Sequence, residues 1–128
     1  MSWFTKIFKS DKEDYLALRE RGYALMFQAF DKLPVTPELD ITVEVKYTLR
    51  IVGSPEKYDY VPYRTKDALG YIPAGYYDST IDTVFMIGKM YNGKVVLDEF
   101  TLGHETEHNL KYDTSESIVN PDKMEDEL

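Results

Sequence analysis

The chain has 128 residues, with fifteen Lys and Arg against 23 Asp and Glu, and it contains no Cys. This length suits one domain with a core of its own and is too short for two ordinary domains. The net charge of −8 disfavours binding to nucleic acid, because phosphate contacts need clustered cations. Without Cys there are no disulfides and no thiolate ligands, so any metal would be held by His, Asp or Glu.

The N-terminus carries an apolar cluster at helical spacing, formed by Trp3, Phe4, Ile7 and Phe8. Two lysines interrupt it, and no apolar run in the chain reaches the length of a signal peptide or a membrane span. We therefore expect no transmembrane segment and a cytoplasmic protein. Residues 1–12 are interpreted as an arm that packs on its own domain or on a protein partner, with a weak interfacial anchor as the alternative. Residues 13–128 are expected to form a single domain.

Two regular elements are predicted in the first half of the chain. Residues 11–33 lack Pro and repeat apolar residues at helical spacing, so we expect a helix there, capped by Asp11 and ended by Pro34. From residue 41 to residue 51, apolar and polar residues alternate strictly, which predicts a strand. The polar face of this strand indicates a sheet that helices cover on one side only.

The region from residue 57 to residue 80 is rich in Tyr, Pro and Gly. It is predicted to be irregular, with short extended pieces at residues 60–63 and 69–72. Residues 81–91 are typical of a second strand. Asn92-Gly93 then provides the sequence of a type I′ hairpin turn, which predicts a returning antiparallel strand.

Two helices are predicted after the hairpin. Asp98 is a suitable N-cap for a helix that carries both histidines of the chain in its middle. Asn120-Pro121 would begin a short terminal helix over residues 121–127, since Pro favours the first helical position.

The two histidines belong to the segment His104-Glu105-Thr106-Glu107-His108. Residues four apart share one face of a helix, so His104 and His108 can direct their imidazoles at one ion. Glu105 is rotated by about 100° and can hold a metal-bound water and accept its proton. This H-E-x-x-H pattern of zinc hydrolases arises by chance in roughly one in a thousand arrangements of two histidines in such a chain. It predicts Zn²⁺ as the cofactor, His104 and His108 as ligands, and Glu105 as the general base.

Two other interpretations of the motif remain open. The histidines could face solvent on an acidic helix without binding a metal. Alternatively, the helix could hold zinc for structure alone. Glu105 argues against the structural site, because such a site has four protein ligands and does not need a base beside an open position.

Residues 102–110, Leu-Gly-His-Glu-Thr-Glu-His-Asn-Leu, resemble the active-site helix of zincin metallopeptidases, particularly of small gluzincin-like and phage-encoded members. Residues 75–88 are similar to the substrate-side strand of that family and its neighbour. The resemblance implies an α+β fold with a small, twisted, mostly antiparallel sheet that includes residues 81–91 and 95–97. It also implies that the first helix lies behind the sheet and that the helix carrying the H-E-x-x-H motif lies beneath the cleft. Tyr76 and Tyr77 would lie near the substrate, unless they are used in the core.

The third zinc ligand is less clearly indicated. The long metallopeptidase motif would have Gly and then His or Asp at the positions of Lys111 and Thr114, so that subclass does not fit. A gluzincin-like site would take a Glu from a later helix, and an aspartate-type site would take an Asp. The candidates are Asp122 and Glu116, with Asp122 slightly favoured, followed by Asp113 and Glu125.

The sequence therefore predicts a zinc-dependent hydrolase, a metallopeptidase acting on a peptide or protein substrate. The first alternative is a catalytically silent zincin-like protein that serves as a structural or binding part of a larger assembly, such as a phage particle, and would then be virion-associated. The second alternative is an acidic interaction domain without a metal.

Overall fold

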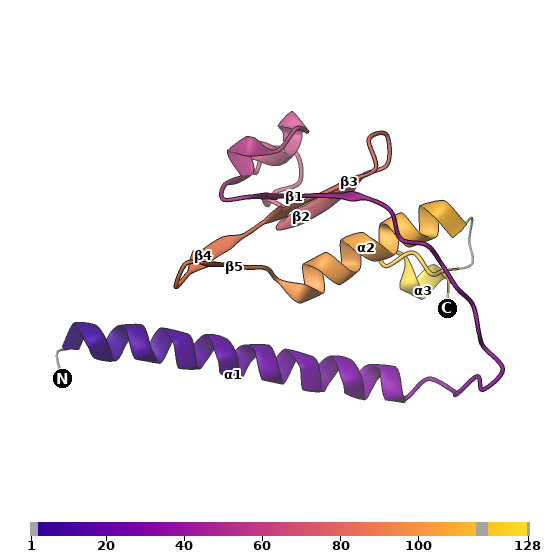
Figure 1. The fold of residues 1–128 in the computed structure, drawn as a ribbon, viewed down its shortest axis with the longest axis horizontal. Coiled ribbons are helices and arrows are strands. Elements are labelled where there is room, and N and C mark those ends of the chain that lie inside the picture. Colours follow the sequence, from indigo (N-terminus) through magenta and orange to yellow (C-terminus); the bar gives the residue numbers. More distant parts are fainter. Residues whose placement is uncertain (1–2, 115–117, 128) are drawn as a thin grey trace. The chain divides into compact units, whose positions relative to one another are not determined.

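The computed structural model describes the backbone of residues 3–114 and 118–127, and their side chains except those of residues 3–11, 113, 114, 125 and 127. The chain divides into two units, Met1–Ile41 and Thr42–Leu128. The predicted α+β class is confirmed, since the structure contains an N-terminal helix, a small sheet and the helix that carries both histidines (Figure 1). None of the helices in the described part of the chain is long and apolar enough to cross a membrane.

The first unit consists of one long helix and the loop after it. Helix α1 spans Trp3–Asp31 and ends three residues before Pro34, which lacks the N–H that a helix interior requires. The predicted helix is therefore present but begins earlier than expected. The predicted boundary at residue 12 lies inside α1, because no Pro interrupts this segment, and the chain divides instead between residues 41 and 42.

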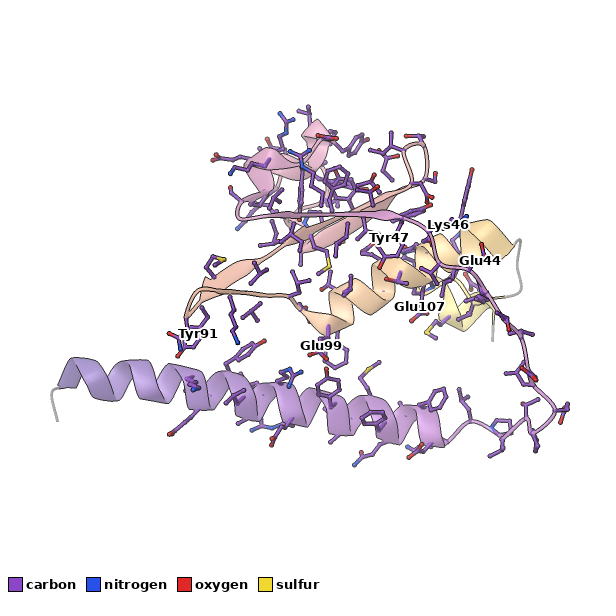
Figure 2. The ribbon with its side chains drawn as sticks, viewed as in Figure 1. Glu44, Lys46, Tyr47, Tyr91, Glu99 and Glu107 are labelled. Carbon is purple, nitrogen blue, oxygen red and sulfur yellow. The ribbon has the colours of Figure 1, made fainter. Side chains whose placement is uncertain are left out.

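Strand β1, Thr48–Val52, is much shorter than the strand predicted for residues 41–51. It pairs in parallel with β3, and this pairing begins at Thr48. The residues just before β1 instead contact the helix that carries both histidines, since the hydroxyl oxygens of Tyr47 and Thr106 lie 2.8 Å apart. Figure 2 shows Tyr47 beside that helix. Alternation alone therefore overestimated the length of this strand. It could not show that the residues before Thr48 lie beside a helix and not beside another strand.

The main sheet has three strands in the order β1-β3-β2. Strand β2, Gly75–Asp78, is antiparallel to β3, Thr83–Ile87. β2 lies in the region that was predicted to be irregular. The extended pieces predicted at residues 60–63 and 69–72 are not strands; the first falls in a 3-10 helix, Val61–Arg64, and the second lies in turns.

The predicted hairpin is confirmed. Strands β4, Lys89–Tyr91, and β5, Lys94–Val96, pair antiparallel around a two-residue turn. Asn92 and Gly93 both have positive φ angles, 50° and 74°, as a type I′ turn requires. However, the strand predicted for residues 81–91 is divided into β3 and β4, and β4-β5 forms a separate two-stranded sheet. Two of the three pairings among the described strands are antiparallel.

The core lies on one face of the three-stranded sheet and is largely aromatic. The rings of Tyr76 and Phe85 stack with their centroids 4.7 Å apart, and Tyr58 packs edge-on against Tyr76 at 4.9 Å. The Tyr58 hydroxyl, which is fully buried, donates to the carbonyl oxygen of Pro73 at 2.7 Å. These contacts attach the irregular segment before β2 to the sheet, and they leave the opposite face to the motif helix.

Helix α2, Glu99–Thr114, packs on that opposite face against β2 and β3. Asp98 caps it as predicted, because its carboxylate accepts from the backbone N–H of Phe100 at 3.1 Å and from the Thr101 hydroxyl at 2.8 Å. The helix comes very close to β2. A Cβ atom on Gly75 would lie 2.8 Å from a β3 carbonyl oxygen and 3.0 Å from Thr101, so only glycine fits there.

The terminal helix α3 is shorter than predicted and spans Met124–Glu127. Asn120 and Asp122 lie before it in a turn, where the side-chain oxygen of Asn120 accepts from the backbone N–H of Asp122 at 2.9 Å. This local hydrogen bond competes with helix formation, which explains the later start of α3. It also holds Asp122 in the turn before α3.

Candidate metal centre

The face of α2 that packs on β2 is formed by residues four apart in the sequence. Glu105 and Asn109 are buried on this face, and Thr101, one turn earlier, contacts the strand at Gly75. All three side chains are polar. A helix that packs on a sheet ordinarily buries apolar residues there, so this polar row lacks the contacts that usually hold a helix on a sheet.

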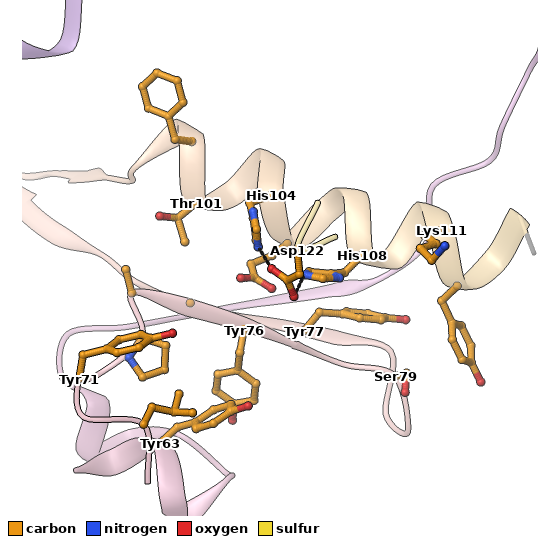
Figure 3. Close-up of a pocket in the computed structure, with 17 residues that line it drawn as sticks. Tyr63, Tyr71, Tyr76, Tyr77, Ser79, Thr101, His104, His108, Lys111 and Asp122 are labelled. Atoms are coloured by element: carbon orange, nitrogen blue, oxygen red, sulfur yellow. Dashed lines mark ion pairs between the residues drawn. The ribbon is translucent and has the colours of Figure 1, made fainter. Parts of the chain in front are cut away.

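The neighbouring face of α2 carries the two histidines, which point toward Asp122 (Figure 3). The Nε2 atom of His104 lies 2.9 Å from one carboxylate oxygen of Asp122, and the Nε2 atom of His108 lies 3.0 Å from the other. One potential ligand atom from each of the three residues falls within 4.8 Å of the other two. The fold therefore brings together both predicted histidines and the favoured aspartate.

The other candidates for the third ligand fall outside what the structure describes. Glu116 lies among residues 115–117, which are not described. Asp113 belongs to α2 and Glu125 to α3, but their side chains are not described either. Among the described residues, Asp122 is thus the acidic side chain that completes a group of three with the histidines.

The donor set suits zinc in number and chemistry. Two imidazole nitrogens and one carboxylate oxygen are the protein ligands of many catalytic zinc sites, which leave the fourth position to water or substrate. Zinc bonds of about 2.0–2.1 Å at tetrahedral angles place the ligand atoms about 3.3 Å apart. The two short separations of 2.9 and 3.0 Å involve different oxygens of Asp122, and the three potential ligand atoms lie within 4.8 Å of one another. Binding one ion would therefore require the side chains to shift by up to about 1.5 Å. Asp122 is exposed and lies in a turn, where such a shift meets little resistance.

Protonation favours metal binding at His108. Burial lowers the pKa of this imidazole, while the negative charge of Asp122 opposes the effect. The neutral imidazole is the form that binds a metal. His108 therefore competes less with protons for a metal ion than a fully exposed histidine would.

Glu105 is a buried carboxyl group beside the histidines, with 8% of its surface exposed. Burial raises its pKa from the usual 4.5 to about 7, and the charge of Asp122 acts in the same direction. His104 and a hydrogen bond from the backbone N–H of Tyr77 oppose this shift. A carboxyl group with a pKa near 7 can both accept and release a proton near neutral pH, as a general base must.

A cleft of about 850 Å³ opens beside these groups. One wall is formed by α2 and the other by β2 and the segment before it (Figure 3). The tyrosines predicted to lie near the substrate differ in use: Tyr76 lines the cleft but is mostly buried in the aromatic core, whereas Tyr77 is half-buried beside α2. Tyr63 and Tyr71 also line the cleft and were not predicted to do so. They come from the irregular region, where no periodic pattern indicated which side chains share a surface.

Comparisons of the chain with protein-family models, with curated proteins and with solved structures found no match. The motif and the geometry around it therefore carry the functional argument without support from relatives.

Proposed function

We propose that this protein is a zinc-dependent hydrolase of the zincin type, with His104, His108 and Asp122 as the metal ligands. The observation that supports this most strongly is the convergence of both imidazoles on one carboxylate, at 2.9 and 3.0 Å, beside a cleft. With Asp122 in this position, the site corresponds to an aspartate-type variant of the zincin arrangement. Zinc bound there would polarise a carbonyl group and acidify a water molecule.

Glu105 is proposed as the general base. Its position one residue after His104 places its carboxylate beside the metal site, on the face of α2 that borders β2. The pKa of about 7 suits a group that takes a proton from the attacking water and passes it to the leaving amine. Burying a carboxylate without a neutralising partner costs stability, which supports a functional reason for its presence.

A peptide substrate is supported by the geometry of β2. The N–H of Ile87 donates to the carbonyl oxygen of Ala74 at 3.0 Å, and bonding to β3 then alternates along the strand. The backbone groups of Gly75 and Tyr77 consequently point away from β3. Both residues line the cleft, so the Gly75 N–H and C=O are suited to pair with an extended peptide.

Two measurements test this proposal. Metal analysis of protein prepared without a histidine tag should find one zinc per chain, and cleavage of a fluorescently labelled casein should require that zinc. Glu105→Gln should retain the zinc and lose turnover, because the amide cannot accept the proton. Glu107→Gln is the matched control, since Glu107 belongs to the same helix but does not line the cleft. Full activity of Glu105→Gln would refute the assigned role of Glu105.

The second candidate function is a silent zincin-like protein that binds partners in a larger assembly. Helix α1, taken by itself, favours it, because four large apolar side chains in its described part, residues 12–31, are at least 60% exposed: Leu18, Leu25, Phe27 and Phe30. The side chains of residues 3–8, where the partner contact was predicted, are not described. Protein that binds one zinc but cleaves neither casein nor a mixed peptide library would favour this second function.

A further inference from the structure

Asn109 follows the second histidine directly and is fully buried. Its side-chain amide nitrogen donates to the carboxylate of Asp82 at 2.8 Å, to the hydroxyl oxygen of Tyr77 at 3.2 Å and to the carbonyl oxygen of Lys46 at 3.3 Å. One side chain thus connects α2 to the segment before β1, to β2 and to the turn between β2 and β3.

The acceptors are also connected to each other. The Tyr77 hydroxyl donates to the same carboxylate oxygen of Asp82 at 2.6 Å. Asp82 has a φ angle of 50°, a left-handed conformation that Asp and Asn tolerate better than most residues. The side-chain oxygen of Asn109, in contrast, has no hydrogen-bond partner among the described residues.

Tyr77 links this cluster to the proposed general base. Its hydroxyl is held by Asn109 and Asp82, while its backbone N–H donates to the carboxylate of Glu105. Glu105 and Asn109 are four residues apart and lie on the same face of α2. The histidines occupy the neighbouring face and are connected to Asp122 instead. The base and the metal ligands are therefore held by separate sets of contacts.

We propose that Asn109, together with Asp82 and Tyr77, positions the carboxylate of Glu105 in the cleft and does not determine the geometry of the metal ligands. Asn109 is thus a positioning residue, and its assigned effect on turnover rests on the proposed function. Its effect on the contact between Glu105 and Tyr77 does not depend on that function, because the contact is made by protein groups alone.

Hydrogen exchange in the metal-free protein tests the structural part. The Tyr77 amide points away from β3, so its protection reports the bond to Glu105 and not the pairing of the sheet. In Asn109→Leu, which keeps a similar volume but cannot donate, we expect this amide to exchange about fivefold faster, as the loss of one hydrogen bond implies. The Phe85 amide, which belongs to the β2-β3 ladder, should be unchanged.

Zinc titration and kinetics test the functional part. Asn109→Leu should bind zinc with wild-type affinity and an unchanged KM, while kcat falls about 100-fold because the base is misplaced. Glu107→Gln, a change on the same helix outside the cleft, should behave like the wild type. If Asn109→Leu does not fold, Tyr77→Phe removes only the hydroxyl and should show the same changes.

Three results would overturn the proposal. The first is unchanged exchange of the backbone amide of residue 77 in both Asn109→Leu and Tyr77→Phe. The second is a loss of zinc affinity that accompanies the loss of kcat, which would mean that Asn109 holds the ligands. The third is a Glu107→Gln variant as impaired as Asn109→Leu. A wild-type protein that binds no zinc would refute the proposed hydrolase, but the exchange experiment would still decide whether Asn109 positions Glu105.

Discussion

Replacing Glu105 by Gln should stabilise the metal-free protein at pH 8 and have little effect at pH 5. Burial raises the pKa of this carboxyl from 4.5 to about 7 in the folded chain. Between these values the unfolded chain has released its proton and the folded chain still holds it. The contribution of Glu105 to the stability of the wild type is therefore largest below pH 4.5 and is lost as the pH rises to 7. The amide of Gln does not ionise, so the variant lacks this dependence.

The magnitude follows from the difference between the two pKa values. A difference of about 2.5 corresponds to about 3 kcal/mol of unfolding free energy at pH 8, and to less than about 1 kcal/mol at pH 5. This is a large share of the total stability expected of a chain of this size. Gln also has nearly the same shape as Glu and can still accept the Tyr77 N–H, so the change adds no new cavity or steric clash.

Urea unfolding followed by circular dichroism, in the presence of a chelator and at pH 5, 6, 7 and 8, measures the difference directly. Glu107→Gln removes the same charge from the same helix outside the cleft and should change the free energy of unfolding by less than about 0.5 kcal/mol at each pH. The reasoning would be refuted if Glu105→Gln were no more stable than the wild type at pH 8. An equal gain at pH 5 and pH 8 would also refute it, because the cause would then not be ionisation.

Further predictions concern the metal ligand, the packing of α2 and the aromatic core. Asp122→Ala should lose the rise in Tm that zinc produces, whereas Asp126→Ala on α3 should keep it, and equal responses would contradict the ligand assignment. Gly75→Ala should lower the free energy of unfolding by about 1–3 kcal/mol, because the added Cβ would lie 2.8 Å from a backbone oxygen. Gly103→Ala, with nothing within 4 Å of the added atom, should raise it by about 0.5–1 kcal/mol, and urea unfolding compares the two. Burial raises the pKa of Tyr58 to about 12, so up to about 3 kcal/mol of stability present below pH 10 should be lost as the pH rises toward 12. Alkaline unfolding of Tyr58→Phe should lack this part of the loss.

Features that depend on neighbouring residues could be predicted from the sequence. The Asn92-Gly93 turn and the Asp98 cap are as expected, because turn and cap preferences act over a few residues. The position of both histidines on one face of α2 follows from helical periodicity alone. The candidate site was recognised from this local pattern.

Features that depend on residues far apart in the chain could not be predicted. Alternation at residues 41–51 indicated a long strand, but pairing of this segment with β3 begins only at Thr48. Strand β2 has no periodic pattern in the sequence. Glycine is needed at position 75 because α2 lies so close, and Tyr76 is buried because it stacks on Phe85. Asn109 was not among the predicted site residues, because its position in the sequence does not distinguish it from other polar residues of a helix. Only its buried contacts with Asp82 and Tyr77 set it apart.

The sequence by itself determined that two imidazoles and a carboxylate would share one helix, because a spacing of four residues is fixed by the geometry of the helix. Only the tertiary structure decided that Asp122, fourteen residues after His108, meets both imidazoles. Asp122 lies in the turn before α3, outside the periodic pattern of α2, so its position depends on tertiary contacts and not on local preference. The burial of Glu105 was decided in the same way, because it depends on how closely α2 approaches β2.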